Sequence, residues 1–531
     1  MLSEKIHDWA LKCPERVAHR HADTVLTYAA LERASNSVAL WLHELSLAQG
    51  IARQTPVVVY GHKESEMLVL FIACSKAGYP YIAVDSSVPA ERLLQIVEAS
   101  GARVVLSPQL VPNVIATTNV IIEEMISLAG QDSILKGYQL EVPSSTWQVQ
   151  LDEVYYIIYT SGSTGVPKGV QLTLRALESF LNWVNSAYQP EERNEVFLNQ
   201  APFSFDLSVM DLYMSLSTGG TLWSVDKDQI ANPKKLFASF ADSQISYWVS
   251  TPSFAEVCLM DPSFKETLLP QVKRFFFCGE ILTHDCASKL TQRFPRAKVE
   301  NLYGPTEATV AVTTLTITSD ILSAYNPLPV GRVKPDAMVL ICDANQLTAE
   351  IVSRKGLLPH RPQALPEGEA GELIIAGPNV SVGYLNNPEQ TEKAFFSWQE
   401  SGLTWHAYRT GDSGLFKEGL LFYQGRLDFQ IKLHGYRIEL GEIEENLRQT
   451  PLVDNAVVLP IERRGKVEYL QAFITVSKPV GDEFQAILAL REALHEHLPD
   501  YMIPRRFKFL QKMPMTPNGK VDRRALLGGQ A

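Results

Sequence analysis

Short apolar runs alternate with longer amphipathic segments through much of the chain. The run TPVVVYG at 55–61 precedes KESEMLVLFIACSKAG at 63–78, and AERLLQIVEAS at 90–100 precedes ARVVLSP at 102–108. The short runs are rich in β-branched residues, whereas the longer segments have apolar residues at helical spacing. Strands that alternate with helices are typical of parallel sheets covered by helices. We therefore expect a large N-terminal α/β part.

Two later segments interrupt this pattern. Segment 350–370, between the strand-like runs VLICD and GELIIAG, is rich in proline, glycine and basic residues and should be a surface excursion. In LFYQGRLDFQIKLHGYRIEL, at 421–440, glycine and charged residues separate two β-like runs. The expected architecture is an N-terminal α/β domain of mixed and parallel sheets at 1–427 and a small, mobile α+β domain at 428–531.

Composition and charge narrow the class of protein. The 531 residues are 46% hydrophobic, and the net charge of −11 is spread over segments of mixed sign, which argues against a nucleic-acid surface. The six cysteines are scattered without a CxxC pair, so neither a disulfide framework nor a zinc site is expected. Segment 1–20 has a charged helical pattern, and no run of about twenty apolar residues occurs. These features predict a cytoplasmic, unprocessed protein without membrane insertion.

A loop suited to phosphate follows the apolar run VYYIIYT. The segment YTSGSTGVPKG, at 159–169, combines glycines, hydroxyls and Lys168. Glycines allow backbone amides to approach an anion closely, hydroxyls donate hydrogen bonds, and lysine supplies positive charge. The spacing is not that of a Walker A loop. Taken alone, the segment could equally be a flexible Gly/Ser turn.

Four further motifs accompany this loop, in a fixed order. They are Asn301–Glu307 (NLYGPTE), Tyr408–Asp412 (YRTGD), Gly425–Asp428 (GRLD) and Pro517–Lys520 (PNGK). Together with the loop they resemble the AMP-forming adenylation superfamily, which includes acyl-CoA ligases, luciferases and the adenylation domains of nonribosomal peptide synthetases. The resemblance extends over essentially the whole chain.

This resemblance implies how ATP is bound. The substrate carboxylate attacks the α-phosphate and pyrophosphate leaves, so catalysis is largely the neutralisation of phosphate charge. Glu307 should bind Mg²⁺ as a hard oxygen ligand. Tyr303 should stack on adenine, and Asp412 should accept both ribose hydroxyls. The implied ATP-binding residues are Thr160, Ser161, Gly162, Ser163, Thr164, Gly165, Lys168, Tyr303, Gly304, Thr306, Asp412 and Arg426.

The resemblance also implies catalytic and hinge positions. Lys520 should bridge the substrate carboxylate and the α-phosphate, with Thr306 and Lys168 as further catalytic residues. Asp428 matches the hinge about which the small domain rotates between the two half-reactions. Considered without its motif, Lys520 would be interpreted as a solvated lysine. Glu307 would be interpreted as an acidic residue at a helix N-terminus. The shared order of five motifs favours the functional interpretation.

Asp206 is the main indication of the acid that is activated. In Phe203–Asp211 (FSFDLSVMD) it matches the aspartate that pairs with the α-ammonium group in amino-acid-activating members. A buried carboxylate is costly unless a cation meets it, and the bound amino acid would supply one. The simpler alternative is that Asp206 is a helix N-cap.

The segments VSTPSFAEVCLMDPSF, FFFCGEIL and YGPTEATVAV resemble a narrower group, the D-alanine to carrier-protein ligases of teichoic acid D-alanylation. In that group the cysteine matching Cys278 lines the amino-acid pocket, and we expect Met210 and Val310 there as well. Leu302 replaces a smaller residue and could fill the space of an alanine methyl. We therefore predict glycine over D-alanine, as in the glycyl-carrier ligases of lipid A modification in Gram-negative bacteria.

The predicted function is ATP- and Mg²⁺-dependent activation of a small amino acid, followed by transfer to phosphopantetheine on a separate carrier protein. The sequence soon ends after Lys520 and shows no carrier segment with a serine for that group. An acyl-CoA ligase is the alternative within the same chemistry, although Asp206 argues against it. A catalytically silent nucleotide-binding protein is the alternative from another class, and the intact Lys168, Glu307 and Asp412 argue against that.

Overall fold

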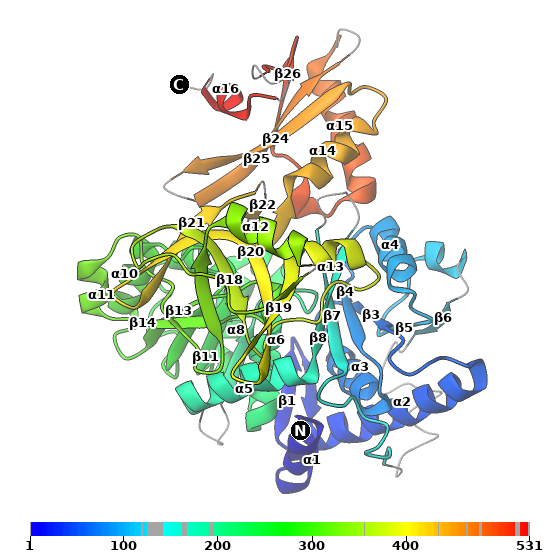
Figure 1. Ribbon diagram of the computed structural model, residues 1–531. Coiled ribbons are helices and arrows are strands. Elements are labelled where there is room, and N and C mark those ends of the chain that lie inside the picture. The colour runs from blue at the N-terminus through cyan, green and yellow to red at the C-terminus, as the bar shows by residue number, and fades with distance from the viewer. Residues whose placement is uncertain are drawn as a thin grey trace. The chain divides into compact units, whose positions relative to one another are not determined.

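The structure is a computed structural model that describes residues 2–117, 120–124, 142–161, 167–190, 195–354, 356–428, 430–433, 435–463, 466–476, 481–515 and 521–528. The chain forms two compact units (Figure 1). The first comprises Met1–Ser86, Val97–Tyr159 and Gly169–Leu427, and the second comprises Ser87–Ile96, Thr160–Lys168 and Asp428–Ala531. That 1–427 and 428–531 act as separate domains stays a prediction.

A six-stranded sheet contains the first runs that the apolar pattern predicted as strands. Its order is β6-β5-β3-β4-β7-β8, and the pairs β3–β4, β3–β5, β4–β7 and β5–β6 are parallel. β3 and β4 are buried at every position, as expected for parallel strands covered on both faces. The elements are β3 (Val57–Gly61), β4 (Tyr81–Asp85), β5 (Val104–Ser107), β6 (Ile121–Glu124), β7 (Val154–Thr160) and β8 (Lys168–Thr173), with α2 (Tyr28–Gln49), α3 (Ser65–Ala77), α4 (Ala90–Ser100), η1 (Asn113–Thr117) and α5 (Leu174–Tyr188).

A nine-stranded sheet has the order β15-β14-β13-β12-β11-β9-β10-β1-β2, and its strands from β13 to β1 are parallel. The helical pattern expected for 1–20 is only partly right. The helix α1 (Leu2–Lys12) ends before Pro14, which disfavours helical geometry in the residue before it, and β1 (Val17–His21) follows. The other elements are β2 (Thr24–Thr27), β9 (Val196–Asn199), α6 (Leu207–Thr218), β10 (Thr221–Ser224), α7 (Lys227–Ala231), α8 (Pro233–Ser243), β11 (Tyr247–Ser250), α9 (Pro252–Leu259), β12 (Arg274–Phe277), α10 (His284–Arg293), β13 (Lys298–Tyr303), η3 (Thr306–Ala308), β14 (Thr313–Ile317), α11 (Ser319–Ala324) and β15 (Arg332–Val333).

A third sheet has the order β16-β18-β20-β19-β17, with β21 paired to β20. Most of the described residues of 350–370 are exposed, as expected, but the segment begins inside a helix and buries Ile351 and Leu358. The elements are β16 (Met338–Cys342), α12 (Ala344–Ser353), β17 (Leu357–Leu358), β18 (Gly371–Ala376), α13 (Pro388–Ala394), β19 (Phe395–Glu400), β20 (Leu403–Lys417) and β21 (Leu420–Arg426).

The C-terminal part of the second unit is the small α+β assembly coloured orange and red in Figure 1. The hairpin β22 (Gln430–Leu433) and β23 (Tyr436–Glu439) precedes a sheet in which β24–β25 is antiparallel and β25–β26 parallel. Ile443, Leu447 and Leu494 belong to its own buried core. The remaining elements are α14 (Leu440–Arg448), β24 (Asn455–Arg463), β25 (Lys466–Thr475), α15 (Glu483–His497), η4 (Asp500–Met502), β26 (Arg506–Leu510) and α16 (Arg523–Gly528).

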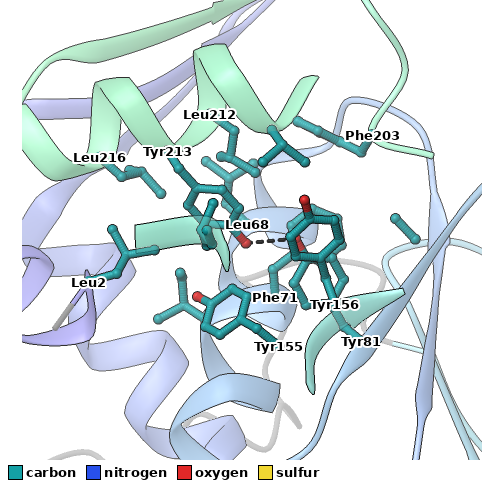
Figure 2. Packing of buried hydrophobic residues seen from close by; sticks show 14 of the residues in the cluster. Leu2, Leu68, Phe71, Tyr81, Tyr155, Tyr156, Phe203, Leu212, Tyr213 and Leu216 are labelled. Atoms are coloured by element: carbon teal, nitrogen blue, oxygen red, sulfur yellow. Dashed lines mark hydrogen bonds between the residues drawn. The ribbon is translucent and has the colours of Figure 1, made fainter. Parts of the chain in front are cut away.

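A group of four tyrosines lies within the large buried cluster of the first unit. Figure 2 shows Tyr81, Tyr155, Tyr156 and Tyr213 among leucine and phenylalanine side chains. The hydroxyl groups of Tyr81 and Tyr213 are 2.7 Å apart and hydrogen-bonded. The Tyr81 ring stacks on Phe71 with a centroid separation of 4.3 Å. Burial raises the pKa of all four tyrosines, so their hydroxyls remain protonated.

All six cysteines lie in the described part of the chain, and no disulfide bond joins them. Across the described part of the chain, no helix has the length and apolar character needed to cross a lipid bilayer.

Candidate active site

Several predicted site residues follow strands of the nine-stranded sheet. Asp206 lies in the loop and helix start after β9, Cys278 directly follows β12, and Thr306 lies just beyond β13. These three strands run parallel, so the segments that leave their carboxyl ends start at one edge of the sheet. This edge is where open α/β sheets bind ligands.

The third sheet and β13 bring together three of the predicted ATP-binding residues. Asp412 on β20 is directly opposite Arg426 on β21, and Arg426 Nη1 lies 2.9 Å from Asp412 Oδ1. The Tyr303 hydroxyl donates a hydrogen bond to Asp412 Oδ2. Asp412 is only 1% exposed, so this carboxylate relies on its cationic and phenolic partners for the charge stabilisation that water would otherwise give.

The same contacts keep Tyr303 a hydrogen-bond donor. Burial, followed by the charge of Asp412, raises the pKa of Tyr303 well above its ordinary value. Arg426 Nη1 also donates to the carbonyl oxygen of Thr410, at 2.8 Å, which fixes the guanidinium beside β20. Each carboxylate oxygen has more than one acceptor lone pair, so Asp412 retains the capacity to accept ribose hydroxyls.

Glu307 is fully buried in the short helix η3. The Tyr384 hydroxyl donates to Glu307 Oε1 at 2.7 Å, and the Ser381 amide donates to the Glu307 carbonyl oxygen at 2.9 Å. The Ser381 contact fixes the backbone of Glu307 and the Tyr384 contact orients its carboxylate, which is thereby preorganised as a ligand for a hard cation. Ser381 and Tyr384 could not be identified as site residues from the sequence, because nothing local links them to a motif more than seventy residues away.

The turn after Glu307 is strained and clamped. Thr309 and Val310 have φ values of +56° and +64°, a region that disfavours β-branched residues. Thr309 Oγ1 donates to the Asn379 carbonyl oxygen at 2.8 Å, and Asn379 Nδ2 donates to the Ala308 carbonyl oxygen at 3.0 Å. At Gly304 an added Cβ would lie 2.5 Å from the Ala311 Cα and 2.8 Å from the Val310 carbonyl oxygen. Only glycine fits at this position.

Asp206 occupies the N-cap position of α6, as the simpler alternative required, but its backbone is helical and its side chain forms no capping hydrogen bond. The residue is partly exposed. Burial, then the charges of Tyr81 and Asp206, raise the pKa of Tyr156, so Asp206 lies within electrostatic range of that side chain. The Tyr156 hydroxyl itself is buried without a hydrogen-bond partner among the described residues.

The four predicted pocket residues Met210, Cys278, Leu302 and Val310 are all buried and belong to one cluster. Cys278 Sγ donates a weak hydrogen bond to the Val310 carbonyl oxygen at 3.5 Å, which joins β12 to the strained turn. Leu302, on β13, is opposite Thr314 of β14.

The predicted phosphate loop is described only at its two ends. The buried Thr160 hydroxyl has no partner among the described residues. Ser161 Oγ donates to the Arg437 carbonyl oxygen at 2.7 Å and accepts from the Glu439 amide at 3.1 Å, and Lys168 Nζ lies 3.6 Å from Glu439 Oε1. All these residues belong to the second unit. Gly162, Ser163, Thr164, Gly165 and Lys520 lie outside the described residues.

Comparison with family models matches almost the whole chain. The model described as "AMP-binding enzyme" matches residues 6–385, and the one described as "AMP-binding enzyme C-terminal domain" matches residues 442–520. The chain belongs to the AMP-binding enzyme family. This agrees with the order of the five motifs and with the predicted fold, an α/β part followed by a smaller α+β part.

Among the relatives of this AMP-binding enzyme are proteins named D-alanine--D-alanyl carrier protein ligase. One from Bacillus cereus is 47% identical over 530 residues, with 99% of each chain covered. The one from Bacillus thuringiensis (strain Al Hakam) is 47% identical over 527 residues, again with 99% of each covered.

Solved structures share the fold at lower identity. PA1221, a nonribosomal peptide synthetase protein with adenylation and PCP domains, has a TM-score of 0.79 at 23% identity, covering 99% of this chain and 84% of that one. The Vibrio cholerae adenylation domain AlmE, in complex with glycyl-adenosine-5'-phosphate, has a TM-score of 0.78 at 22% identity, covering 100% and 98%.

The described residues of this AMP-binding enzyme fit a nucleotide and a magnesium ion. In the second unit, the Lys168 ammonium and the Thr160 hydroxyl, which has no hydrogen-bond partner among the described residues, are donors of the kind that phosphate oxygens need. No group of three or more His, Cys, Asp or Glu residues in the described part of the chain could hold a metal alone. A single buried carboxylate such as Glu307 suits Mg²⁺, which takes its other ligands from water and substrate phosphates.

Proposed function

We propose that this protein uses ATP to activate D-alanine as an aminoacyl adenylate and transfers it to the phosphopantetheine thiol of a separate carrier protein. The chain is 47% identical, over 99% of its length, to ligases named for D-alanine and its carrier protein. This likeness supports the proposed substrate and acceptor. The observation that carries the amino-acid part is Asp206, a carboxylate at the start of α6 that is not used as a helix cap.

Glycine, which the sequence analysis predicted, is not supported by these relatives, and neither is lipid A modification. The likeness to AlmE at 22% identity concerns the fold alone. The glycine prediction depended on the size of Leu302. That side chain is packed in a large buried cluster, where neighbouring side chains and small backbone shifts also determine the space near a substrate methyl. One residue is therefore a weak basis for choosing between the two substrates.

The proposed chemistry assigns each site residue a task. Asp206 pairs with the α-ammonium group, and Met210, Cys278, Leu302 and Val310 surround the small side chain. Asp412, with Arg426 and Tyr303, holds the nucleoside end of ATP. Thr306 and the loop that starts at Thr160 contact the phosphates. A bound Mg²⁺ at Glu307 would neutralise phosphate charge, and Lys520 would bridge the reacting carboxylate and α-phosphate.

The decisive experiment is amino-acid-dependent exchange of labelled pyrophosphate into ATP. D-alanine, L-alanine, glycine and serine are compared at equal concentration, with Lys520→Ala as a control that should abolish most of the exchange. D-alanine should give the highest kcat/KM, and a preference for glycine would replace the proposed substrate. Exchange with fatty acids but not with amino acids would indicate an acyl-CoA ligase instead.

The second half-reaction requires its own measurement. The purified protein is incubated with ATP, labelled D-alanine and a carrier protein, either with or without its phosphopantetheine group. Label should appear only on the phosphopantetheinylated carrier, and thiol-specific cleavage should release it. Transfer to coenzyme A with equal efficiency would contradict the proposed acceptor.

A further inference from the structure

Lys63 is a fully buried cation to which the chemistry above gives no role. It lies between β3 and α3, and its side chain is completely inaccessible. Its ammonium group donates to Asn199 Oδ1 and to the Ala201 carbonyl oxygen, and it lies 4.6 Å from the centroid of the Phe203 ring. A buried ammonium needs such compensation for lost hydration. All three contacts are at the end of β9 or in the loop that follows it.

Asn199 extends the contacts of Lys63 to the helix beyond the loop. Its Nδ2 donates to Asp211 Oδ1 on α6 at 3.1 Å and to the Ala201 carbonyl oxygen at 3.3 Å. Asp211 is fully buried, and its Oδ2 has no hydrogen-bond partner among the described residues. Burial raises the pKa of Asp211, and the positive charge of Lys63 opposes this rise. Lys63 therefore connects the end of β9, the loop and the second turn of α6.

The connected loop is the one that ends at Asp206. Inside it, the Phe205 amide donates to the Pro202 carbonyl oxygen at 2.9 Å, and the loop joins α6 where Ser208 Oγ donates to the Phe205 carbonyl oxygen at 2.6 Å. The Phe203 ring packs edge-on against Phe71 of α3, with centroids 5.5 Å apart, and both side chains are labelled in Figure 2. The loop is therefore held at Ala201 by Lys63 and at Phe205 by Ser208, and it leads directly into Asp206.

We propose that Lys63 is a positioning residue for the amino-acid substrate. It fixes the loop from Ala201 to Asp206 so that the Asp206 carboxylate meets the α-ammonium group. This inference rests on the proposed function, in which Asp206 pairs with that group. Among the described residues, the side-chain contacts of Lys63 are with Asn199, Ala201 and Phe203, none of which is a predicted nucleotide-binding residue, so its loss should affect amino-acid binding selectively.

The test is Lys63→Met, which keeps the length of the side chain but removes the cation. In pyrophosphate exchange the KM for D-alanine should rise about tenfold to a hundredfold, because small displacements of a positioned group have effects of this size. The KM for ATP and the kcat should change less than about twofold, as expected if only amino-acid positioning is lost.

Lys76→Met is a matched control. Lys76 is also buried and donates to Glu32, Ser35 and Asn36, but it lies at the opposite end of α3. The 13 residues of that helix separate the two lysines by about 20 Å. Lys76→Met should lower the melting temperature without changing the KM for D-alanine.

Two results would overturn the proposal: an unchanged KM for D-alanine in Lys63→Met, or an equal rise in Lys76→Met. If Lys63→Met does not fold, the double variant Lys63→Met with Asp211→Asn removes the titratable carboxyl group beside it and is measured in the same way. Parent protein without any amino-acid-dependent exchange would refute the proposed function and this inference together. Active parent protein with an unaffected Lys63 variant would refute only the inference.

Discussion

The hydrogen bond from Tyr384 to Glu307 predicts how strongly the enzyme depends on magnesium. Tyr384→Phe removes the hydroxyl that donates to Glu307 Oε1 at 2.7 Å but keeps the ring, which is 5% exposed and packs edge-on against Phe395. A hydrogen bond to a charged group contributes about 1.5 to 3 kcal/mol. Partners that orient a metal ligand typically change metal affinity by about tenfold to a hundredfold. We therefore expect the Mg²⁺ concentration for half-maximal exchange to rise about tenfold.

The assay is pyrophosphate exchange with saturating ATP and D-alanine and with free Mg²⁺ as the variable. Tyr188→Phe is the control, because Tyr188 is also buried and, within the described residues, its hydroxyl is hydrogen-bonded to the neutral side chain of Thr314. Both variants should lose similar thermal stability, while only Tyr384→Phe should need more Mg²⁺. An unchanged Mg²⁺ dependence in Tyr384→Phe would refute the reasoning that this hydroxyl orients a metal-binding carboxylate.

Three further predictions concern the amino-acid site and Lys63. Asp206→Asn should lower kcat/KM for the amino acid in the exchange assay by about thirtyfold or more, since removing one partner of a close charge pair costs about 2 to 5 kcal/mol. A parent-like value would exclude the pairing. Leu302→Thr should raise the ratio of kcat/KM for D-alanine to that for glycine, and a constant ratio would show that Leu302 does not border the methyl group. Burial lowers the pKa of Lys63 to about 8, with Asp211, Asp85 and Asp226 opposing the shift and Lys227 adding to it. Between about pH 8 and the ordinary lysine pKa near 10, the folded state then binds fewer protons than the unfolded state. The free energy of unfolding should therefore rise with pH in that window. Urea titrations of Lys63→Met should lack this rise.

Much of the fold could be predicted because its strands are short, buried and β-branched. The runs at β3, β5 and β7 bury nearly every residue, so the apolar pattern and the strand coincide. The N-terminal helix was overextended because its periodicity persists past Lys12, although Pro14 prevents the helix from continuing. Sheet order could not be predicted, because it depends on pairings between distant segments such as β1 with β10.

The candidate site was predictable where chemistry lies in contiguous motifs and not where it depends on tertiary contacts. Asp412 and Arg426 belong to separate motifs that an antiparallel pair places opposite each other. Tyr384 has no local signal, because its partner Glu307 is distant in the sequence. Lys63, in HKESE, has the appearance of a solvated charged residue at a helix start, and only the packing of β9 and α6 against it shows that it is buried.

The four tyrosines shown in Figure 2 set an alkaline limit to the fold. In the folded protein Tyr81, Tyr155, Tyr156 and Tyr213 remain protonated beyond the pH near 10 at which exposed tyrosines ionise, because burial opposes their charged form. The unfolded chain would release these protons at that pH, so each further increase in pH favours unfolding by an amount that grows with the number of such groups. Since the four hydroxyls belong to one cluster of the first unit, their loss of protons would be concerted, and phenolate absorbance would appear as that cluster opens.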